Sequence, residues 1–555
     1  MKVIHLDQLE PLSVSFDSLV MVQLWKYIIL LGLLQPGQCF TLGSIEDSLH
    51  DWLISAKTHK FEHLAGRSAR FKVYLMTDKS NDAIARSTTQ QVISRSGYNY
   101  ENHNVLADDG YITQLVRIIN PLADRAKLKQ PPVMLMHGGT IDPTAYVWAS
   151  SIQHHPEKYP RTSEDGPITS WNRSLGFTLA NNGYDVWLVG TRGCNRQNQG
   201  HVKFANLDPK SSEWKVLKDL KLSKRLLPKE YWYYTMDNII DYELPRQIEK
   251  VLSVTAADKI SLLGYSMSSQ ITLALLASKP SYAAKVHNYI SMAPLLNNKD
   301  DTKLVNAIQK IVVTLANDAG VSFANRILFS EQAQEIAALV NDLIGLRYTL
   351  VKQLTTTFFG ASQKYQTLLE PAVVGNLLMQ TGFVEVKQYC QQVIATRLQK
   401  FDYGQAKNII MYGKSKPPIY NISNIHVKNW IVVSGSTDIL SSLTSVKQLL
   451  DTVGPKPLER IVAPGYNHLD LVAGVENDIF VNLPILKFLD QHQLPIREDF
   501  NSANAYKRSV IQQNLDEYVP AQSPSDSSFI DGVMIRASEP RLLERSLSMA
   551  FNSTN

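Results

Sequence analysis

The chain has few cysteines and no group of residues with the spacing of a metal site. Its 555 residues include three cysteines, Cys39, Cys194 and Cys390. That number excludes a fold built on many disulfides, and the spacing matches no zinc site. Charge of one sign is not in large excess either, because the formal net charge is +5. So mild a balance does not indicate a nucleic-acid partner. We expect neither a metal nor another cofactor.

The chain also lacks an apolar run of the roughly 20 residues that a membrane span needs. The nearest candidate, residues 27–34, follows Lys26 and precedes a stretch of small residues that ends at Cys39. This pattern is typical of a cleavable secretory signal, and a retained anchor is the alternative. We predict a signal peptide over residues 1–39. Met21 is the better start, because the residues before it include three acidic side chains.

The remaining composition is that of a soluble globular protein with a large core, with 44% hydrophobic and 19% charged residues. Short buried runs suit parallel strands covered on both faces, and they alternate with helical stretches. A predicted hairpin around Asp109-Gly110 precedes them. The pattern predicts an α/β fold with a mostly parallel, doubly wound sheet. The runs are residues 132–136, 184–189, 260–263 and 430–433.

One long segment departs from this rhythm. Residues 298–400 carry apolar positions at helical spacing and no strand run, which predicts a helical insertion with an acyl pocket on its inner face. The last sixty or so residues are polar and are expected to be disordered. The predicted organisation is a signal at 1–39, an extension at 40–90, a core in two parts at 91–297 and 401–495, the insertion at 298–400 and a tail at 496–555.

The stretch around Ser266 is the first that carries chemistry. The apolar run 260–263 leads into Gly264, then Ser266, then an apolar stretch that suits a helix. A serine at the apex of a sharp strand-to-helix turn is the nucleophile elbow of α/β-hydrolases. The position two residues after the serine is usually glycine, and Ser268 stands there instead. Mild crowding is the expected result.

A serine hydroxyl becomes a good nucleophile only beside a base, usually a histidine that a carboxylate orients. In α/β-hydrolases the acid follows the serine in the chain. Asp438 comes directly after the buried run 430–433, where this fold places functional loops. Asp402 is the weaker candidate, because its aromatic neighbours indicate a packed loop.

His468 is the predicted base, because it follows the last apolar run and comes after Asp438 in the chain. His492 is the other histidine after that acid, and it lies in a polar stretch. Asp470 could compete with Asp438 as the orienting acid. We prefer Asp438, because residues two apart in a tight loop rarely point at each other.

The negative oxygen that develops on the substrate needs two backbone N–H groups aimed at it. The predicted donors are Met267, directly after the nucleophile, and Gly139, in the loop that follows the run 132–136. If only its N–H is used, the side chain of Met267 should matter little.

Together these motifs resemble the acid lipases, the family that includes gastric and lysosomal acid lipase. The likeness covers residues 91–490 and implies a helical cap over the site and a secreted or lysosomal hydrolase of neutral-lipid esters. The matching stretches include Asp108-Asp109-Gly110-Tyr111, His137-Gly138, Asn172-Arg173-Ser174-Leu175, Gly183-Tyr184-Asp185-Val186-Trp187, Phe401-Asp402-Tyr403-Gly404, Pro417-Pro418-Ile419-Tyr420-Asn421 and Tyr466-Asn467-His468-Leu469-Asp470.

The chain also departs from the family. The family's elbow reads Gly-His-Ser-Gln-Gly, whereas Tyr265, Met267 and Ser268 stand here in place of the His, the Gln and the second Gly. Gly139 stands where the family has Leu. The predicted cap lacks the family's cysteine pair. These departures bear on efficiency and substrate range more than on fold.

The leading hypothesis is a serine esterase that acts on triacylglycerol or steryl esters at a lipid–water interface, through an acyl-enzyme on Ser266. The alternatives are a weakly active or inactive lipid-binding or storage protein on the same fold, and a peptidase that uses the same triad. Secretion would expose three glycosylation sequons, at Asn172, Asn421 and Asn552.

Overall fold

The computed structural model describes most of the predicted core. The described residues are 87–149, 162–163, 166–167, 173–194, 200–204, 229–294, 356, 359–362, 382–474 and 476–495. The predicted signal peptide, the tail, most of the extension and most of the helical insertion therefore lie outside the described residues. Among the described helices, none has the length and apolarity to cross a membrane.

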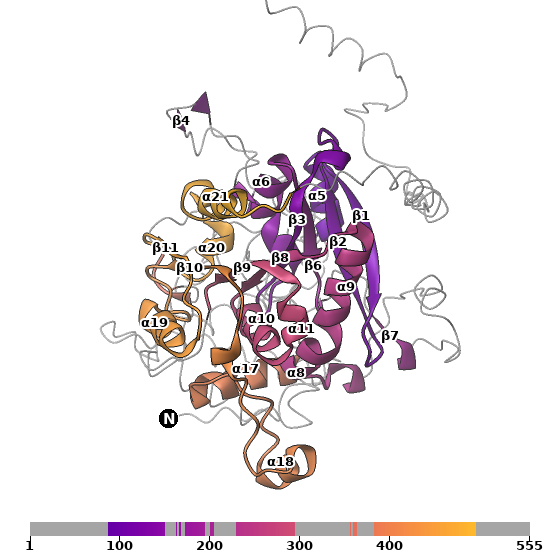
Figure 1. The fold of residues 1–555 in the computed structure, drawn as a ribbon, viewed down its shortest axis with the longest axis vertical. Coiled ribbons are helices and arrows are strands. Elements are labelled where there is room, and N and C mark those ends of the chain that lie inside the picture. The colour runs from indigo at the N-terminus through magenta and orange to yellow at the C-terminus, as the bar shows by residue number, and fades with distance from the viewer. Residues whose placement is uncertain are drawn as a thin grey trace, which may run out of the picture. The chain divides into compact units, whose positions relative to one another are not determined.

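Nine of the described strands form one sheet, ordered β1-β2-β6-β3-β8-β9-β10-β11, with β7 paired to β2 (Figure 1). Every pair from β6 to β11 is parallel, whereas β2 is antiparallel to both β1 and β6. Because parallel strands share one carboxyl edge, the loops that follow them gather there. The strands are β1 Asn99–Leu106, β2 Tyr111–Ile119, β3 Lys129–Met136, β6 Tyr184–Val189, β7 Gly200–His201, β8 Ile260–Tyr265, β9 Val286–Met292, β10 Asn429–Gly435 and β11 Glu459–Ala463.

Helices cover both faces of this sheet. Side chains of α5, α6 and α21 join one buried apolar cluster, and side chains of α9, α10 and α19 join the other. Alternate residues of one strand enter opposite clusters, as Leu135 and Met136 do in β3. The helices are α5 Thr89–Arg95, α6 Leu175–Asn181, α8 Met236–Asn238, α9 Leu244–Thr255, α10 Met267–Ser278, α11 Pro280–Ala283, α17 Phe383–Ala395, α18 Gln405–Tyr412, α19 Leu443–Thr452, α20 Asp470–Ala473 and α21 Leu483–Gln491.

The predicted α/β class and mostly parallel sheet are confirmed. Each predicted run lies in a strand, and the run 184–189 matches β6 residue for residue. The hairpin turns at Gly110, whose φ is +92°. We did not predict β9, because His287, Asn288 and Ser291 interrupt its apolar residues. The Asn288 amide donates to Ser261 Oγ on the neighbouring strand β8 at 3.0 Å.

The short pair β4 Thr162–Ser163 and β5 Gly166–Pro167 forms a separate two-stranded sheet. Helix α5 spans the predicted domain boundary at residue 90 and buries Val92 and Ile93 in the core. Within the predicted insertion, α17 is helical as expected.

A buried ion pair joins β2 to β6 near the edge of the sheet. The Arg117 guanidinium donates to both carboxylate oxygens of Asp185, at 2.7 and 2.6 Å, and to Glu101 at 3.0 Å. Burial alone would raise the pKa of Glu101, but His103, whose Nε2 lies 3.5 Å from Glu101 Oε2, and the charges of Arg117 and Arg125 outweigh it and lower that pKa well below its usual range.

Replacing Asp185 with alanine should therefore destabilise the fold strongly. The change leaves Arg117 buried with one acid in place of two, and breaking a buried pair costs about 3 kcal/mol. Urea unfolding of the variant measures the loss. Lys447→Ala is the matched control, because it removes an exposed partner of Asp451 and should change stability little. An equal loss in both variants would contradict a special role for the buried pair.

Candidate active site

Ser266 occupies the turn between β8 and α10. Its φ of 55° and ψ of −121° are unusual for a residue with a side chain, and such strain persists where the surroundings impose it. A Cβ at Gly264 would lie 2.4 Å from Thr272 Oγ1 and 2.8 Å from the Ser268 carbonyl oxygen. Strand and helix are thus too close for any residue but glycine at position 264.

His468 hydrogen-bonds to both Ser266 and Asp438. Its Nε2 lies 2.7 Å from Ser266 Oγ, and its Nδ1 lies 2.8 Å from Asp438 Oδ2. All three side chains are buried. Because a carboxylate only accepts, the ring proton belongs on Nδ1, which leaves Nε2 free to accept the serine proton. The arrangement can deprotonate the hydroxyl and hold the resulting charge.

Backbone contacts fix the acid and the base in place. Asp438 Oδ1 accepts the N–H groups of Leu440 at 2.9 Å and Ser441 at 2.8 Å. The His468 carbonyl accepts the Tyr265 hydroxyl at 2.7 Å, and the two rings stack with centroids 5.3 Å apart. Tyr265 is one of the departures from the acid lipase elbow, and here it contacts the histidine directly.

Part of the predicted insertion contacts the same loops. The N–H of His468 donates to the Phe359 carbonyl at 3.1 Å, and the Asn467 amide donates to the Gly360 carbonyl at 3.0 Å. A Cβ on Gly360, whose φ is +100°, would lie 2.0 Å from the Thr437 carbonyl oxygen. Residues 359–362 therefore lie against both the acid loop and the base loop.

The competing candidates lie in other contacts. Asp470 accepts the N–H of Asn467 at 2.6 Å and the hydroxyl of Ser362 at 2.8 Å, so it shapes the turn that carries the histidine. Asp402 accepts the Gly404 N–H and the Asn408 amide in a separate loop. His492 bonds to the Phe488 carbonyl at the end of α21.

The loop after β3 is held by the ring of His137, a residue to which the sequence analysis gave no role of its own. Nδ1 donates to the Gly138 carbonyl at 2.8 Å, and Nε2 lies 3.1 Å from Thr191 Oγ1. Burial lowers the pKa of His137, which favours the neutral ring that these contacts require. In a trans peptide the C=O and N–H point in opposite directions, so the Gly139 N–H points away from this ring.

Ser268 ties the elbow to that loop. Its hydroxyl donates to the carbonyl of His137, so it adds a hydrogen bond between the elbow and this loop. The side chain of Met267 lies against Gly139. A Cβ at Gly139 would come within 3.2 Å of Met267 Sδ and Cε. Two of the departures from the family are thus in direct contact with each other.

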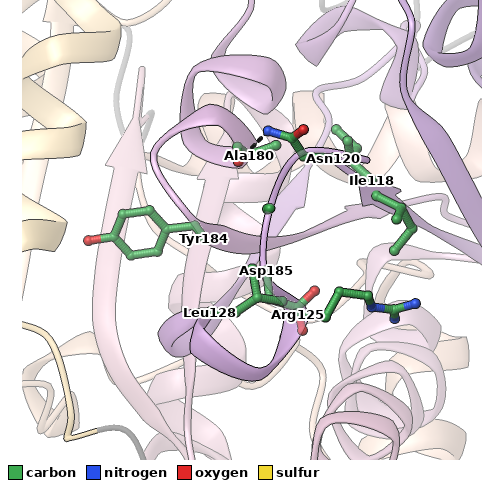
Figure 2. Close-up of a pocket in the computed structure, with 9 residues that line it drawn as sticks. Ile118, Asn120, Arg125, Leu128, Ala180, Tyr184 and Asp185 are labelled. Carbon is green, nitrogen blue, oxygen red and sulfur yellow. Dashed lines mark hydrogen bonds between the residues drawn. The ribbon is translucent and has the colours of Figure 1, made fainter. Parts of the chain in front are cut away.

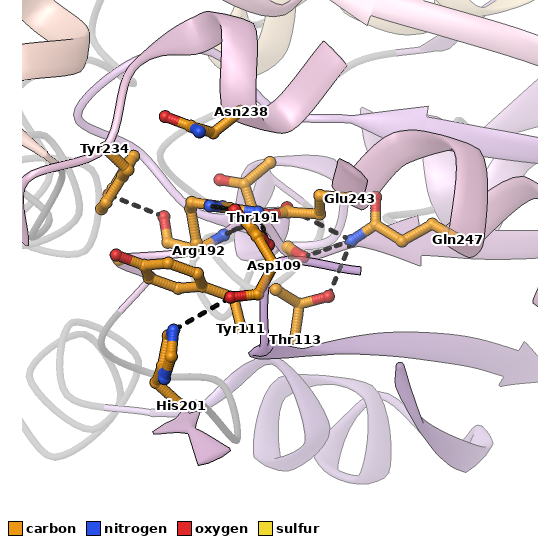
Figure 3. Close-up of polar contacts among 12 residues, drawn as sticks. Asp109, Tyr111, Thr113, Thr191, Arg192, His201, Tyr234, Asn238, Glu243 and Gln247 are labelled. Atoms are coloured by element: carbon orange, nitrogen blue, oxygen red, sulfur yellow. Dashed lines mark hydrogen bonds and ion pairs between the residues drawn. The ribbon is translucent and has the colours of Figure 1, made fainter. Parts of the chain in front are cut away.

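The residue after Thr191, Arg192, belongs to a buried ionic network (Figure 3). The fully buried Arg192 donates to Glu243 and to Asp109, each at 2.6 Å, and its guanidinium lies 3.9 Å from the centre of the Tyr111 ring. The Arg192 N–H also donates to Glu243, at 3.1 Å. This network fixes the segment that contacts His137. In the sequence these residues are marked only by an Asp-Gly turn and an Arg-Gly turn, each after a strand, and no local pattern connects the two turns.

The described residues offer no other site of comparable chemistry. No group of three histidine, cysteine or acidic residues in them could hold a metal ion. Cys194 and Cys390 are both buried, and burial raises the pKa of Cys390 to about 12. A surface hollow beside Asn120, Arg125 and Tyr184 includes none of the residues around Ser266 (Figure 2).

Comparison with known proteins finds similarity to lipases. Residues 89–149, which contain β1 to β3 and the His137 loop, match the model of the partial alpha/beta-hydrolase lipase region. The solved esterase from Exiguobacterium antarcticum overlaps 70% of this chain and all of its own at 10% identity, with a TM-score of 0.39. A TM-score this low does not establish the fold. The evidence for the fold is the strand order of the sheet and the strand-to-helix turn at Ser266.

Curated relatives match over most of both chains. Human lipase member K is 26% identical over 424 residues, covering 75% of this chain and 94% of its own. Bovine gastric triacylglycerol lipase is 25% identical over 432 residues, covering 76% and 94%. Lipase 1 of Drosophila melanogaster is 24% identical, covering 70% and 76%. The chain is therefore a carboxylic ester hydrolase with the α/β-hydrolase fold, and its matches support the acid lipase family.

Proposed function

We propose that the chain hydrolyses neutral-lipid esters through an acyl-enzyme on Ser266, with His468 as the base and Asp438 as the acid that orients it. The hydrogen-bonded series from Ser266 Oγ through His468 to Asp438 carries the proposal. An inactive lipid-binding protein, the alternative, would not require a strained serine that hydrogen-bonds to a histidine. Triacylglycerol or steryl esters are the proposed substrates, in keeping with the gastric triacylglycerol lipases among the relatives.

The proposed reaction has two halves. Ser266 Oγ attacks the ester carbonyl carbon while His468 Nε2 takes the hydroxyl proton, and that proton then goes to the departing alcohol oxygen. Water, deprotonated by His468, attacks the acyl carbonyl carbon. The bond from that carbon to Ser266 Oγ then breaks, His468 returns the proton to Oγ, and the fatty acid leaves. The N–H groups of Gly139 and Met267 are the proposed donors to the negative oxygen in both halves. Within the described residues, neither N–H has another acceptor.

We propose a secreted or lysosomal location. The apolar run before Cys39 and the three sequons support it. Asn421 is exposed at the start of a short helical turn, where a glycan can be attached without unfolding. Asn172 and Asn552 lie outside the described residues, as does most of the proposed cap, residues 298–400.

Removing any member of the triad should abolish most ester hydrolysis while the protein stays folded. Ser266→Ala and His468→Ala should each lower kcat by several orders of magnitude, and Asp438→Asn by somewhat less. Hydrolysis of an acyl-ester panel beside a peptide amide measures the loss and separates an esterase from a peptidase. A fluorophosphonate probe should label the parent chain and not Ser266→Ala.

Asp470→Asn is the matched control for the acid. It alters the turn that holds His468 without touching the ring, so its effect should be milder than that of Asp438→Asn. A greater loss of ester hydrolysis in Asp470→Asn than in Asp438→Asn would mean that Asp438 is not the orienting acid. Absence of probe labelling in the folded parent protein would favour the lipid-binding alternative.

Ser268→Ala should slow turnover and lower stability by about 1 kcal/mol, because it removes a buried hydrogen bond. The change removes the hydroxyl that holds the His137 carbonyl, so the Gly139 donor loses part of its positioning. A hydrogen bond of this kind corresponds to about a tenfold loss in kcat, with KM nearly unchanged. Affinity for a boronic acid that mimics the tetrahedral intermediate should fall in proportion. Ser278→Ala, on the same helix, is the control, because its hydroxyl contacts only its own helix at Ala274.

Processing gives a separate prediction. The mature chain should begin near Phe40 or later, and Asn421 should carry a glycan. Amino-terminal sequencing and the mass shift after enzymatic deglycosylation check both, with Asn421→Gln as the control for the site. An intact Met1 on an unglycosylated cytosolic protein would overturn the proposed location.

A further inference from the structure

Helix α18 lies in the segment that connects α17 to β10. The two ends of this segment meet, because the Lys400 N–H donates to the Pro418 carbonyl at 2.9 Å and Gln399 pairs with Ile419. Figure 1 shows α18 beyond α17, away from the sheet. None of its side chains belongs to either buried apolar cluster.

Internal contacts hold this helix in one conformation. Asn408, which is 1% exposed, donates to Asp402 Oδ1 at 2.7 Å and to the Ser415 carbonyl at 3.0 Å. Its side-chain oxygen accepts the Tyr403 N–H at 2.9 Å. One buried amide therefore joins the segment before the helix to the segment after it. These contacts fix the conformation in which α18 exposes its side chains.

What α18 displays is apolar. Ile409 is 54% exposed, Ile410 81% and Met411 52%. Single exposed apolar side chains are ordinary, but three in succession on a helix spread over about 200° of its circumference. Such a surface gains free energy only when something apolar covers it.

The charge around these side chains has one sign. Lys407, Lys414 and Lys416 are exposed, and no acidic residue occurs from 405 to 419. Apolar side chains flanked by lysines suit an anionic lipid surface, into which the apolar groups insert while the ammonium groups stay with the head groups. Lysine is depleted in protein–protein interfaces, so a protein partner fits less well.

We propose that α18, with Ile409, Ile410 and Met411 and its flanking lysines, is the surface by which this protein binds anionic phospholipid at a lipid–water interface. The reason for such binding rests on the proposed function, since a hydrolase of lipid esters must reach substrate in a lipid phase. Binding does not depend on turnover. It can therefore be measured on the Ser266→Ala protein.

The test is flotation of full-length Ser266→Ala with vesicles of phosphatidylcholine, alone or mixed with phosphatidylserine. We expect clear binding to the mixed vesicles and weaker binding to phosphatidylcholine alone. Adding Ile410→Asp should weaken binding to the mixed vesicles at least tenfold, because a charged side chain replaces an apolar one that would insert into the lipid. Reversing all three lysines to glutamate should remove the preference for phosphatidylserine.

Leu122→Asp is the matched control, because Leu122 is 93% exposed and lies on a different turn. Equal loss in Leu122→Asp and Ile410→Asp, or unchanged binding in Ile410→Asp, overturns the proposal. So does a dimer of the parent protein that Ile410→Asp dissociates without any vesicle binding, since α18 would then cover a second copy. Thermal unfolding verifies that each variant folds.

The active chain adds a second readout. Ile410→Asp should slow hydrolysis of an emulsified long-chain ester at least tenfold and leave a short soluble ester unaffected. Equal slowing on both substrates contradicts an interface role. If the parent protein hydrolyses neither ester, the proposed function fails, while flotation still decides the role of α18.

Discussion

The close approach of β8 and α10 at Ser266 is the constraint on which the rest of the site depends. It forces a left-handed φ on the serine and leaves no room for a side chain at Gly264. It also brings the first turn of α10 against the loop after β3, so that Ser268 reaches the His137 carbonyl. Nucleophile and proposed oxyanion donors are thereby parts of one rigid unit.

That unit is supported by polar groups that have little access to water. Thr191 contacts the His137 ring, and the next residue, Arg192, is enclosed by two acids and a tyrosine ring. Buried charges are costly unless paired, so such a network tolerates few alternative arrangements. We infer that its value is geometric. It gives the loop one position at some cost in stability.

Much of the fold could be predicted because strands buried on both faces have continuous apolar runs, as β3 does at residues 132–136. Strand β9 could not, since its polar residues are satisfied by neighbours far away in sequence. The order of serine, acid and histidine predicted which side chains meet at the carboxyl edge. The Ser268 contact could not be predicted, because it joins residues 131 positions apart and depends on a hydroxyl direction that no local pattern encodes. The packing of Met267 on Gly139 was missed for the same reason.

The contact between Met267 and Gly139 couples the two positions. A Cβ at position 139 would come within 3.2 Å of Met267 Sδ and Cε, so a larger residue there requires the flexible end of the methionine to move. The effect of a substitution at either position therefore depends on the residue that stands at the other.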